Sequence, residues 1–216
     1  MKRFVDRSEA GRALAAHLME YADGDTIVLA LPRGGVPVAF EIAVALDVRM
    51  DVLIVRKIGV PWNPEYALGA IASDGIVVLD ETLMNELGLS RADLASILWA
   101  ESRELKRREK LYRGNEPYPE LEDHTVLLVD DGLATGSTML AAVKVVRTRR
   151  PRRVVVAVPI ASIEACSGLE RVADRTVCVE TPEPFFGVGV WYEDFSQTSD
   201  EQVLALLAQA RVVRSL

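Results

Sequence analysis

The chain has 216 residues, of which 50% are apolar and 6% aromatic, and its formal net charge is −7 from 25 Lys and Arg against 32 Asp and Glu. This length predicts one medium-sized domain over 1–216, and so acidic a chain is a poor nucleic-acid binder without a local basic patch. No apolar run is long enough to cross a bilayer, and the charged start lacks the apolar segment of a signal peptide. We therefore expect a cytoplasmic protein in which Cys166 and Cys178 are reduced thiols.

The first quarter of the chain alternates helix and strand patterns. Asp6 followed by Glu9 has the spacing of a capping box and predicts the start of a helix. The expected elements are a helix from Asp6, a strand over 26–31, a glycine-rich turn over 32–35, a buried helix over 36–46 and a strand over 51–55 that ends in Arg56 and Lys57.

The middle of the chain departs from this alternation. Two prolines favour a loop over 59–67, and two short strands are expected within 69–80, joined by the turn signal at 73–75. Ser90 predicts the start of a long helix within an inserted helical segment of about 82–113.

The outer face of that long helix is basic over 103–110. Glu104 precedes Arg108 by four residues, and Glu109 precedes Arg113 in the same way, which is the favourable order for ion pairs on a helix. A nucleic-acid surface and a solvated helix with internal ion pairs both fit this pattern, and the solvated helix is the favoured interpretation.

The second half of the chain returns to alternating strands and helices. The expected elements are a strand over 126–129, a helix to about 149, a strand over 154–162, a helix through Ala165, a strand over 176–179 and a helix over 202–210. This alternation predicts an α/β fold with a doubly wound, mainly parallel sheet. Ligands bind such sheets beyond the carboxyl ends of the strands. The turns at 33–35, 56–57 and 130–131 are therefore expected to converge on one crevice.

The run VLLVDDGLATGST over 126–138 carries the strongest chemical signal. Asp130 and Asp131 end an apolar strand, where two carboxylates suit a vicinal diol or water held by Mg²⁺. A turn of small residues follows at the start of a helix, where backbone N–H groups suit a phosphate; its members are Ala134, Thr135, Gly136, Ser137 and Thr138. A phospho-receiver domain can also begin in this way, but the next strand here lacks the phosphoacceptor aspartate that such a domain needs.

This run closely resembles the signature of type I phosphoribosyltransferases, which use 5-phosphoribosyl-1-pyrophosphate (PRPP). The resemblance implies their fold, with a small C-terminal hood mainly over 181–200. It implies an enzyme of nucleotide metabolism that uses PRPP and Mg²⁺ and displaces pyrophosphate from C1 of PRPP by a nucleobase-like or amine acceptor. In this family Asp130 and Asp131 would hold the ribose and the metal, and the 134–138 turn would hold the 5-phosphate. The protein is expected to form a homo-oligomer, specifically a dimer.

The turn after the first strand resembles the pyrophosphate loop of the same family. Arg33 and the backbone of Gly34 and Gly35 would hold pyrophosphate, and the two glycines would allow close approach and positive φ. The family often has a non-proline cis peptide here, expected at Pro32-Arg33 or Arg33-Gly34. Lys57 would help to hold the leaving pyrophosphate, although two cations at a strand end can also be a solvated terminus.

Aromatic residues concentrate in the tail over 185–195. By resemblance to 6-oxopurine phosphoribosyltransferases, Phe186 would stack on the acceptor, with Trp191 and Tyr192 beside it, and Asp194 would face Mg²⁺. Packing of the hood against the rest of the domain is the alternative explanation for the same aromatic residues.

Two departures from the 6-oxopurine pattern bear on the acceptor. Ala134 stands where those enzymes usually have an acid, and 159–161 lacks the lysine that reads the base carbonyl. We therefore expect guanine and hypoxanthine to be poor substrates. A non-catalytic PRPP sensor that controls nucleic-acid binding, and a hydrolase of phosphoribosyl compounds, stay open as alternatives to the transferase.

Overall fold

The computed structural model describes residues 3–72 and 75–213 and contains a five-stranded parallel sheet in the order β2-β1-β6-β7-β8. The strands are β1 (Thr26–Ala30), β2 (Arg49–Val52), β6 (Thr125–Val129), β7 (Arg153–Ile160) and β8 (Arg175–Glu180). Their helices are α1 (Arg7–Ala15), α2 (Gly35–Leu46), α5 (Ser137–Arg147), α6 (Ile163–Glu170) and α7 (Asp200–Val213). The expected doubly wound α/β fold is confirmed.

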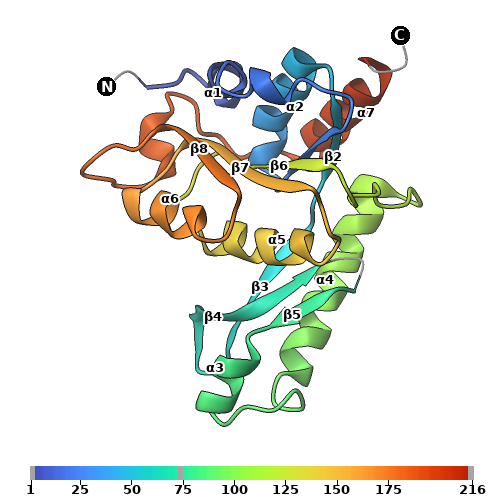
Figure 1. Ribbon diagram of the computed structural model, residues 1–216, viewed down its shortest axis with the longest axis vertical. Helices are drawn as coiled ribbons and strands as arrows, with labels where there is room; N and C mark the ends of the chain where they lie inside the picture. The colour runs from blue at the N-terminus through green and yellow to red at the C-terminus, as the bar shows by residue number, and fades with distance from the viewer. Residues whose placement is uncertain (1–2, 73–74, 214–216) are drawn as a thin grey trace.

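The helices cover both faces of this sheet. Successive side chains of a strand point to opposite faces, so apolar residues in a row need a helix on each side. Val28 and Leu127 belong to a core shared with α1, α2 and α7, whereas their neighbours Ile27 and Val126 belong to a core shared with α5 and α6. Figure 1 shows α1, α2 and α7 above the sheet and α5 and α6 below it. Because every residue of β1 and β6 is buried, these central strands read as continuous apolar runs.

A second, antiparallel sheet lies beyond α5, in the lower half of Figure 1. It is built from β3 (Val55–Val60), β4 (Asn63–Ala72) and β5 (Val77–Leu79), followed by α3 (Glu81–Glu86) and α4 (Ala95–Arg113). Val55, Ala70 and Ala72 pack into the core that contains α5. Helix α5 is therefore enclosed between the two sheets.

Three expectations for this region are wrong. The strand over 51–55 is divided, because β2 ends at Val52 and the chain then crosses to the second sheet. The residues of the expected loop over 59–67 lie mostly in the β3–β4 hairpin. Near Pro64, β4 does not pair with β5, so the absence of a backbone N–H in proline costs little there. The long helix begins at Ala95, because Ser90 bonds Asp93 in a turn that precedes it. The strands expected within 69–80 are present, and the turn residues 73–74 lie outside the described part of the chain.

The ion pairs of α4 follow the expectation in one case only. Glu104 accepts from Arg108 at 2.7 Å, as expected, and also from Arg107 at 2.9 Å. Arg113 instead pairs with Asp51 of β2, and its guanidinium lies 3.9 Å from the centroid of the Tyr118 ring. Arg113 and Asp51 are both buried, so this pair attaches the end of α4 to the parallel sheet.

The segment over 181–200 has little regular structure beyond the short 3-10 helix η2 (Val188–Trp191). It is fastened to the start of the chain, where Phe4 N donates to Trp191 O at 2.9 Å and Asp194 N donates to Val5 O at 2.9 Å. The expected capping of α1 is confirmed, because Asp6 accepts from Glu9 N at 2.8 Å. Within the described residues, no helix has the length and apolar character needed to cross a membrane.

The buried pair of Asp51 and Arg113 gives a test of the fold. Arg113→Met should lower the free energy of unfolding by about 3–5 kcal/mol, because it leaves a buried carboxylate unpaired. The double variant Asp51→Val and Arg113→Met should recover most of that loss. Urea denaturation measures both, and Arg91→Met, which breaks an exposed pair with Glu81, is the control and should cost at most about 1 kcal/mol. A double variant that is no more stable than Arg113→Met alone would contradict this.

Candidate active site

Two turns meet at the carboxyl edge of the parallel sheet. Strand β1 pairs with β6 in register from Thr26 with Thr125 to Ala30 with Val129, so both strands end at the same level. A methyl group on Gly34 would lie 2.0 Å from Asp131 Oδ2, and one on Gly35 would lie 2.7 Å from the Val129 carbonyl oxygen. A side chain at Gly34 would have to displace the Asp131 carboxylate, and one at Gly35 would clash with the backbone of 129–130. The loop backbone therefore lies directly against the acid pair.

The conformation of this loop agrees with the expectation in one respect and differs in another. The peptide bond between Pro32 and Arg33 is cis, at one of the two expected positions. Gly34 has φ −61° and ψ −34°, so the expected positive φ is wrong there. The glycine is needed for close approach to Asp131.

The carboxylates of Asp130 and Asp131 are part-buried neighbours. Asp131 N donates to Asp130 Oδ1 at 2.8 Å. Burial raises the pKa of Asp130 well above its usual value, and the charge of Asp131 raises it further. Burial also raises the pKa of Asp131, while its hydrogen bond from Arg7 opposes that rise. Two adjacent part-buried carboxylates are costly without partners, so the pair is suited to a ligand that supplies hydroxyl donors or a cation.

Arg7 completes this arrangement and is not predictable from the sequence pattern. Its Nε donates to Asp131 Oδ2 at 2.8 Å, its Nη1 donates to Ser196 O at 2.8 Å, and its guanidinium lies 4.0 Å from the centroid of the Phe195 ring. The contact with Asp131 spans 124 residues. No local pattern around Arg7 distinguishes it from the other arginines of the charged N-terminal segment.

The turn after the acid pair forms a small hollow at the start of α5. Its volume is about 120 Å³, and Asp130 and residues 132–139 line it. Gly136 has φ 70° and precedes the first helical residue, so the first N–H groups of α5 lie beside the hollow. Among them, Ser137 N makes a long hydrogen bond of 3.4 Å to Thr135 Oγ1. Ser162 Oγ donates to Ala134 O at 2.8 Å and fixes the turn to α6. This geometry suits a phosphate group.

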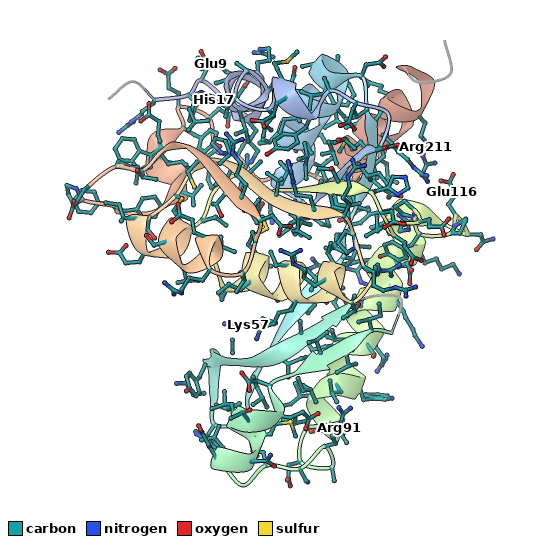
Figure 2. All side chains as sticks on the ribbon, in the orientation of Figure 1. Glu9, His17, Lys57, Arg91, Glu116 and Arg211 are labelled. Atoms are coloured by element: carbon teal, nitrogen blue, oxygen red, sulfur yellow. The ribbon has the colours of Figure 1, made fainter. Side chains whose placement is uncertain are left out.

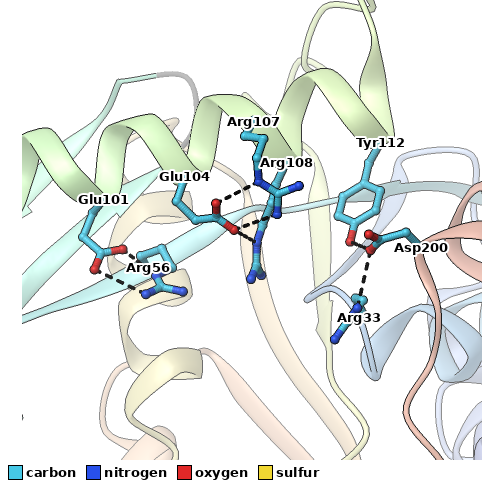
Figure 3. Close-up of polar contacts among 8 residues, drawn as sticks. All are labelled: Arg33, Arg56, Glu101, Glu104, Arg107, Arg108, Tyr112 and Asp200. Atoms are coloured by element: carbon cyan, nitrogen blue, oxygen red, sulfur yellow. Dashed lines mark hydrogen bonds and ion pairs between the residues drawn. The ribbon is translucent and has the colours of Figure 1, made fainter.

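Arg33 contacts a carboxylate of α7 that is also bonded to α4. Its Nη1 lies 3.7 Å from Asp200 Oδ1, and the Tyr112 hydroxyl donates to the same oxygen at 2.5 Å (Figure 3). Burial is the main cause that raises the pKa of Tyr112 to about 12, and the hydrogen bond with Asp200 is the second cause. Asp200 and Tyr112 are further site neighbours that the sequence analysis missed, because they lie 88 residues apart.

Arg56 and Lys57 do not lie where they were expected. Both belong to β3 of the second sheet, so the expectation that they end a strand of the parallel sheet is wrong. Arg56 makes a two-point contact with Glu101 of α4, with Nε to Oε2 at 2.6 Å and Nη2 to Oε1 at 3.3 Å. Figure 2 shows Lys57 where the second sheet faces α5. Arg56 and Lys57 lie in the second sheet because the expected strand over 51–55 is divided after Val52.

The aromatic tail divides between surface and core. Phe186 is 76% exposed, whereas Tyr192 is 3% exposed. The Tyr192 ring contacts Phe4 and Phe195, with centroids 5.7 Å and 5.0 Å away, and its hydroxyl donates to Asp131 O at 2.6 Å. The expectation that Tyr192 covers an acceptor is therefore wrong, because its ring is buried in the hood. Trp191 is half-buried in the same apolar cluster.

Asp194 is exposed and accepts from Ser196 N at 2.8 Å, a hydrogen bond that lowers its pKa. Within 3–72 and 75–213, no three acidic, histidine or cysteine side chains cluster as a metal site, so Asp194 does not join the acid pair in one. Asp130 and Asp131 are oxygen donors of the kind that Mg²⁺ prefers, and the remaining ligands would have to come from substrate and water.

The chain is similar to known proteins over most of its length. The model of the phosphoribosyl transferase domain matches residues 6–194, so the chain belongs to that family. A protein of Mycobacterium tuberculosis H37Rv with the provisional name phosphoribosyl transferase is 44% identical over 211 residues, which cover 97% of this chain and 47% of that protein. The chain thus spans about half the length of that curated relative. The crystal structure of the protein TT1426 from Thermus thermophilus is 42% identical, has a TM-score of 0.89 and covers 96% of this chain and 98% of that one.

The raised pKa of Asp130 predicts a pH-dependent stability in the ligand-free protein. A carboxyl whose pKa is higher in the folded state contributes most below its unfolded value of about 3.9, and this contribution is lost as pH rises through the folded value. Asp130→Asn should therefore raise the melting temperature at neutral pH and weaken its fall with rising pH. Asp131→Asn should lower the melting temperature, because it leaves Arg7, whose side chain is 11% exposed, without its carboxylate. Equal destabilisation by both variants in thermal melts at pH 5 to 8 would contradict this assignment.

Proposed function

We propose that this protein is a PRPP-dependent phosphoribosyltransferase that displaces pyrophosphate from C1 of PRPP by a small acceptor. The observation that carries the proposal is the contact of Gly34 and Gly35 with the Asp130–Asp131 edge. It brings a loop suited to pyrophosphate beside carboxylates suited to ribose hydroxyls. The phosphate-sized hollow over 132–139 borders the same carboxylates.

The proposed roles follow the chemistry of each group. The N–H groups at the start of α5 hold the 5-phosphate, with the hydroxyls of Thr135, Ser137 and Thr138 beside them. Asp130 and Asp131 hold the ribose hydroxyls and stabilise the positive charge that develops at C1. Arg33 and the amides of Gly34 and Gly35 stabilise the departing pyrophosphate. Bound Mg²⁺ would add positive charge at the leaving group, and the acid pair would hold it.

The acceptor is proposed to bind against Phe186 of the hood. This ring is exposed and lies on a segment whose other aromatics, Tyr192 and Trp191, pack inward. Ala134 and the 159–161 strand end provide no proton-transfer or carbonyl-reading group, so guanine and hypoxanthine are proposed to be poor acceptors. Lys57 keeps its proposed leaving-group role by family resemblance alone, because its strand lies in the second sheet.

The sensor alternative depended on the basic face of α4. In the structure Arg107 and Arg108 share Glu104, which has a pKa lowered to about 2 by hydrogen bonds from both and is therefore ionised at neutral pH. These contacts support the solvated helix with internal ion pairs. The transferase is the better supported function.

Binding of the ribose phosphate end tests the site. Ribose 5-phosphate, and PRPP with Mg²⁺, should each raise the melting temperature, because a ligand that binds only the folded state stabilises it. Gly34→Ala should disrupt this site, since its methyl group would displace Asp131, and turnover should fall about 100-fold. Gly24→Ala is the matched control, because a methyl group there meets nothing within 4 Å. An unchanged melting temperature with millimolar ligand, or equal effects of the two variants, would refute the assignment.

Acceptor choice is tested with a panel of nucleobases and amines, assayed by pyrophosphate release. With any acceptor found, Phe186→Ala should weaken acceptor binding by about 1–3 kcal/mol, as for a lost stacking partner, and leave the PRPP affinity unchanged. Trp99→Ala, which removes a 63% exposed ring on α4, is the control. Equal losses of acceptor and PRPP affinity in Phe186→Ala would show that this ring has a structural role.

A further inference from the structure

One face of α4 carries charged and polar groups from its middle to its C-terminal end. Glu101, Glu104, Arg108 and Tyr112 follow one another at spacings of three or four residues, so they form one stripe along the helix. Figure 3 shows Glu101 of this stripe bonded to Arg56 of β3 at one end, and Tyr112 at the other end bonded to Asp200, which contacts Arg33 of the glycine-rich loop. The stripe therefore connects the second sheet with the candidate active site.

The C-terminal end of α4 is held firmly against the parallel sheet. Arg113 forms its buried pair with Asp51, and Tyr112, which is 4% exposed, donates to Asp200. Asp200 in turn contacts Arg33. Arg108 lies one helical turn before Tyr112, and its position relative to Arg33 is therefore set by anchored neighbours.

Arg108 has binding capacity that its present partner does not use. Its Nε donates to Glu104 at 2.7 Å, whereas its two Nη groups meet no hydrogen-bond acceptor in the part of the chain that the structure describes. Its side chain is 31% exposed. Figure 3 shows the side chains of Arg108 and Arg33 on the same side of α4 in this view, with Asp200 between Arg33 and the Tyr112 hydroxyl.

The charges along this stripe leave an excess of positive charge. Arg107 and Arg108 share the single carboxylate of Glu104, whereas Arg56 has Glu101 and Arg33 has Asp200. Each carboxylate orients a guanidinium without occupying all of its N–H groups. Such a row of oriented, incompletely used arginine forks suits the oxygens of a diphosphate.

We propose that Arg108 of α4, together with Arg56 of β3, which pairs with Glu101 of α4, extends the Arg33 end of the site into a binding track for pyrophosphate, both as the leaving group of PRPP and as the free product. This proposal rests on the proposed function, because Arg33 marks the pyrophosphate end only if the acid pair holds the ribose. The track gives a function to the basic segment of α4 and explains why α4 is attached to the parallel sheet beside the glycine-rich loop.

Titration calorimetry with two probes tests the track separately from the site. Inorganic pyrophosphate with Mg²⁺ is the probe for the track, and ribose 5-phosphate, which has no pyrophosphate, is the probe for the acid pair and the 5-phosphate hollow. Arg108→Gln should weaken pyrophosphate binding about tenfold, the effect of one lost charge-assisted contact, and leave the ribose 5-phosphate affinity unchanged. Arg108→Lys, which keeps the charge but not the fork, should recover part of the loss.

Arg103→Gln is the matched control on the same helix. Arg103 lies over the exposed Trp99 ring, 4.8 Å from its centroid, and is outside the stripe. This variant should bind both probes as the natural protein does. Unchanged pyrophosphate affinity in Arg108→Gln, or an equal loss for both probes, would overturn the track. If the natural protein binds ribose 5-phosphate but not pyrophosphate, the track alone fails; if it binds neither, the proposed function fails.

Discussion

The structure depends on the parallel pairing of β1 with β6. Every residue of both strands is buried, and their register brings Ala30 level with Val129. As a result, two turns that lie far apart in the sequence leave the sheet side by side. The backbone of Gly34 then rests on Asp131, and each turn limits the space available to the other. The candidate site is thus a product of strand register more than of any single motif.

The acid pair shows what such proximity costs in the absence of a ligand. Burial makes ionisation of Asp130 unfavourable, and Arg7 compensates Asp131 more directly, through its hydrogen bond. Two adjacent carboxylates at this position therefore make the ligand-free protein less stable than apolar side chains there would. The same Arg7 also fastens the hood, through Ser196 and Phe195, to the strand end below it. Charge compensation and hood placement consequently depend on one side chain.

Local patterns were sufficient to predict the parallel sheet, the position of Asp130 and Asp131 at a strand end, the turn that precedes α5 and the capped start of α1. They failed where the result depends on distant partners. The end of β2 at Val52 could not be predicted, because the apolar pattern continues without a break into β3. The prolines over 59–67 predicted a loop, but a proline is tolerated in β4 there because that part of β4 does not pair with β5. Arg113 had a suitable local partner in Glu109 but found a buried one in Asp51. The contacts that Arg7 and Tyr112 make with their carboxylates span 124 and 88 residues, beyond the range of helix or strand periodicity.

The pairing of Arg113 with Asp51 also bears on how the second sheet and α4 could be exchanged between proteins. An engineer who removed 53–113 as an independent module would leave a carboxylate within β2 whose counter-charge had departed with the module. A transplanted version of the module would in turn carry an arginine that requires an acid at the position of Asp51 in its new host. Recombination at this boundary is therefore constrained to exchange both residues together, and the chain is less modular than its two separate sheets suggest.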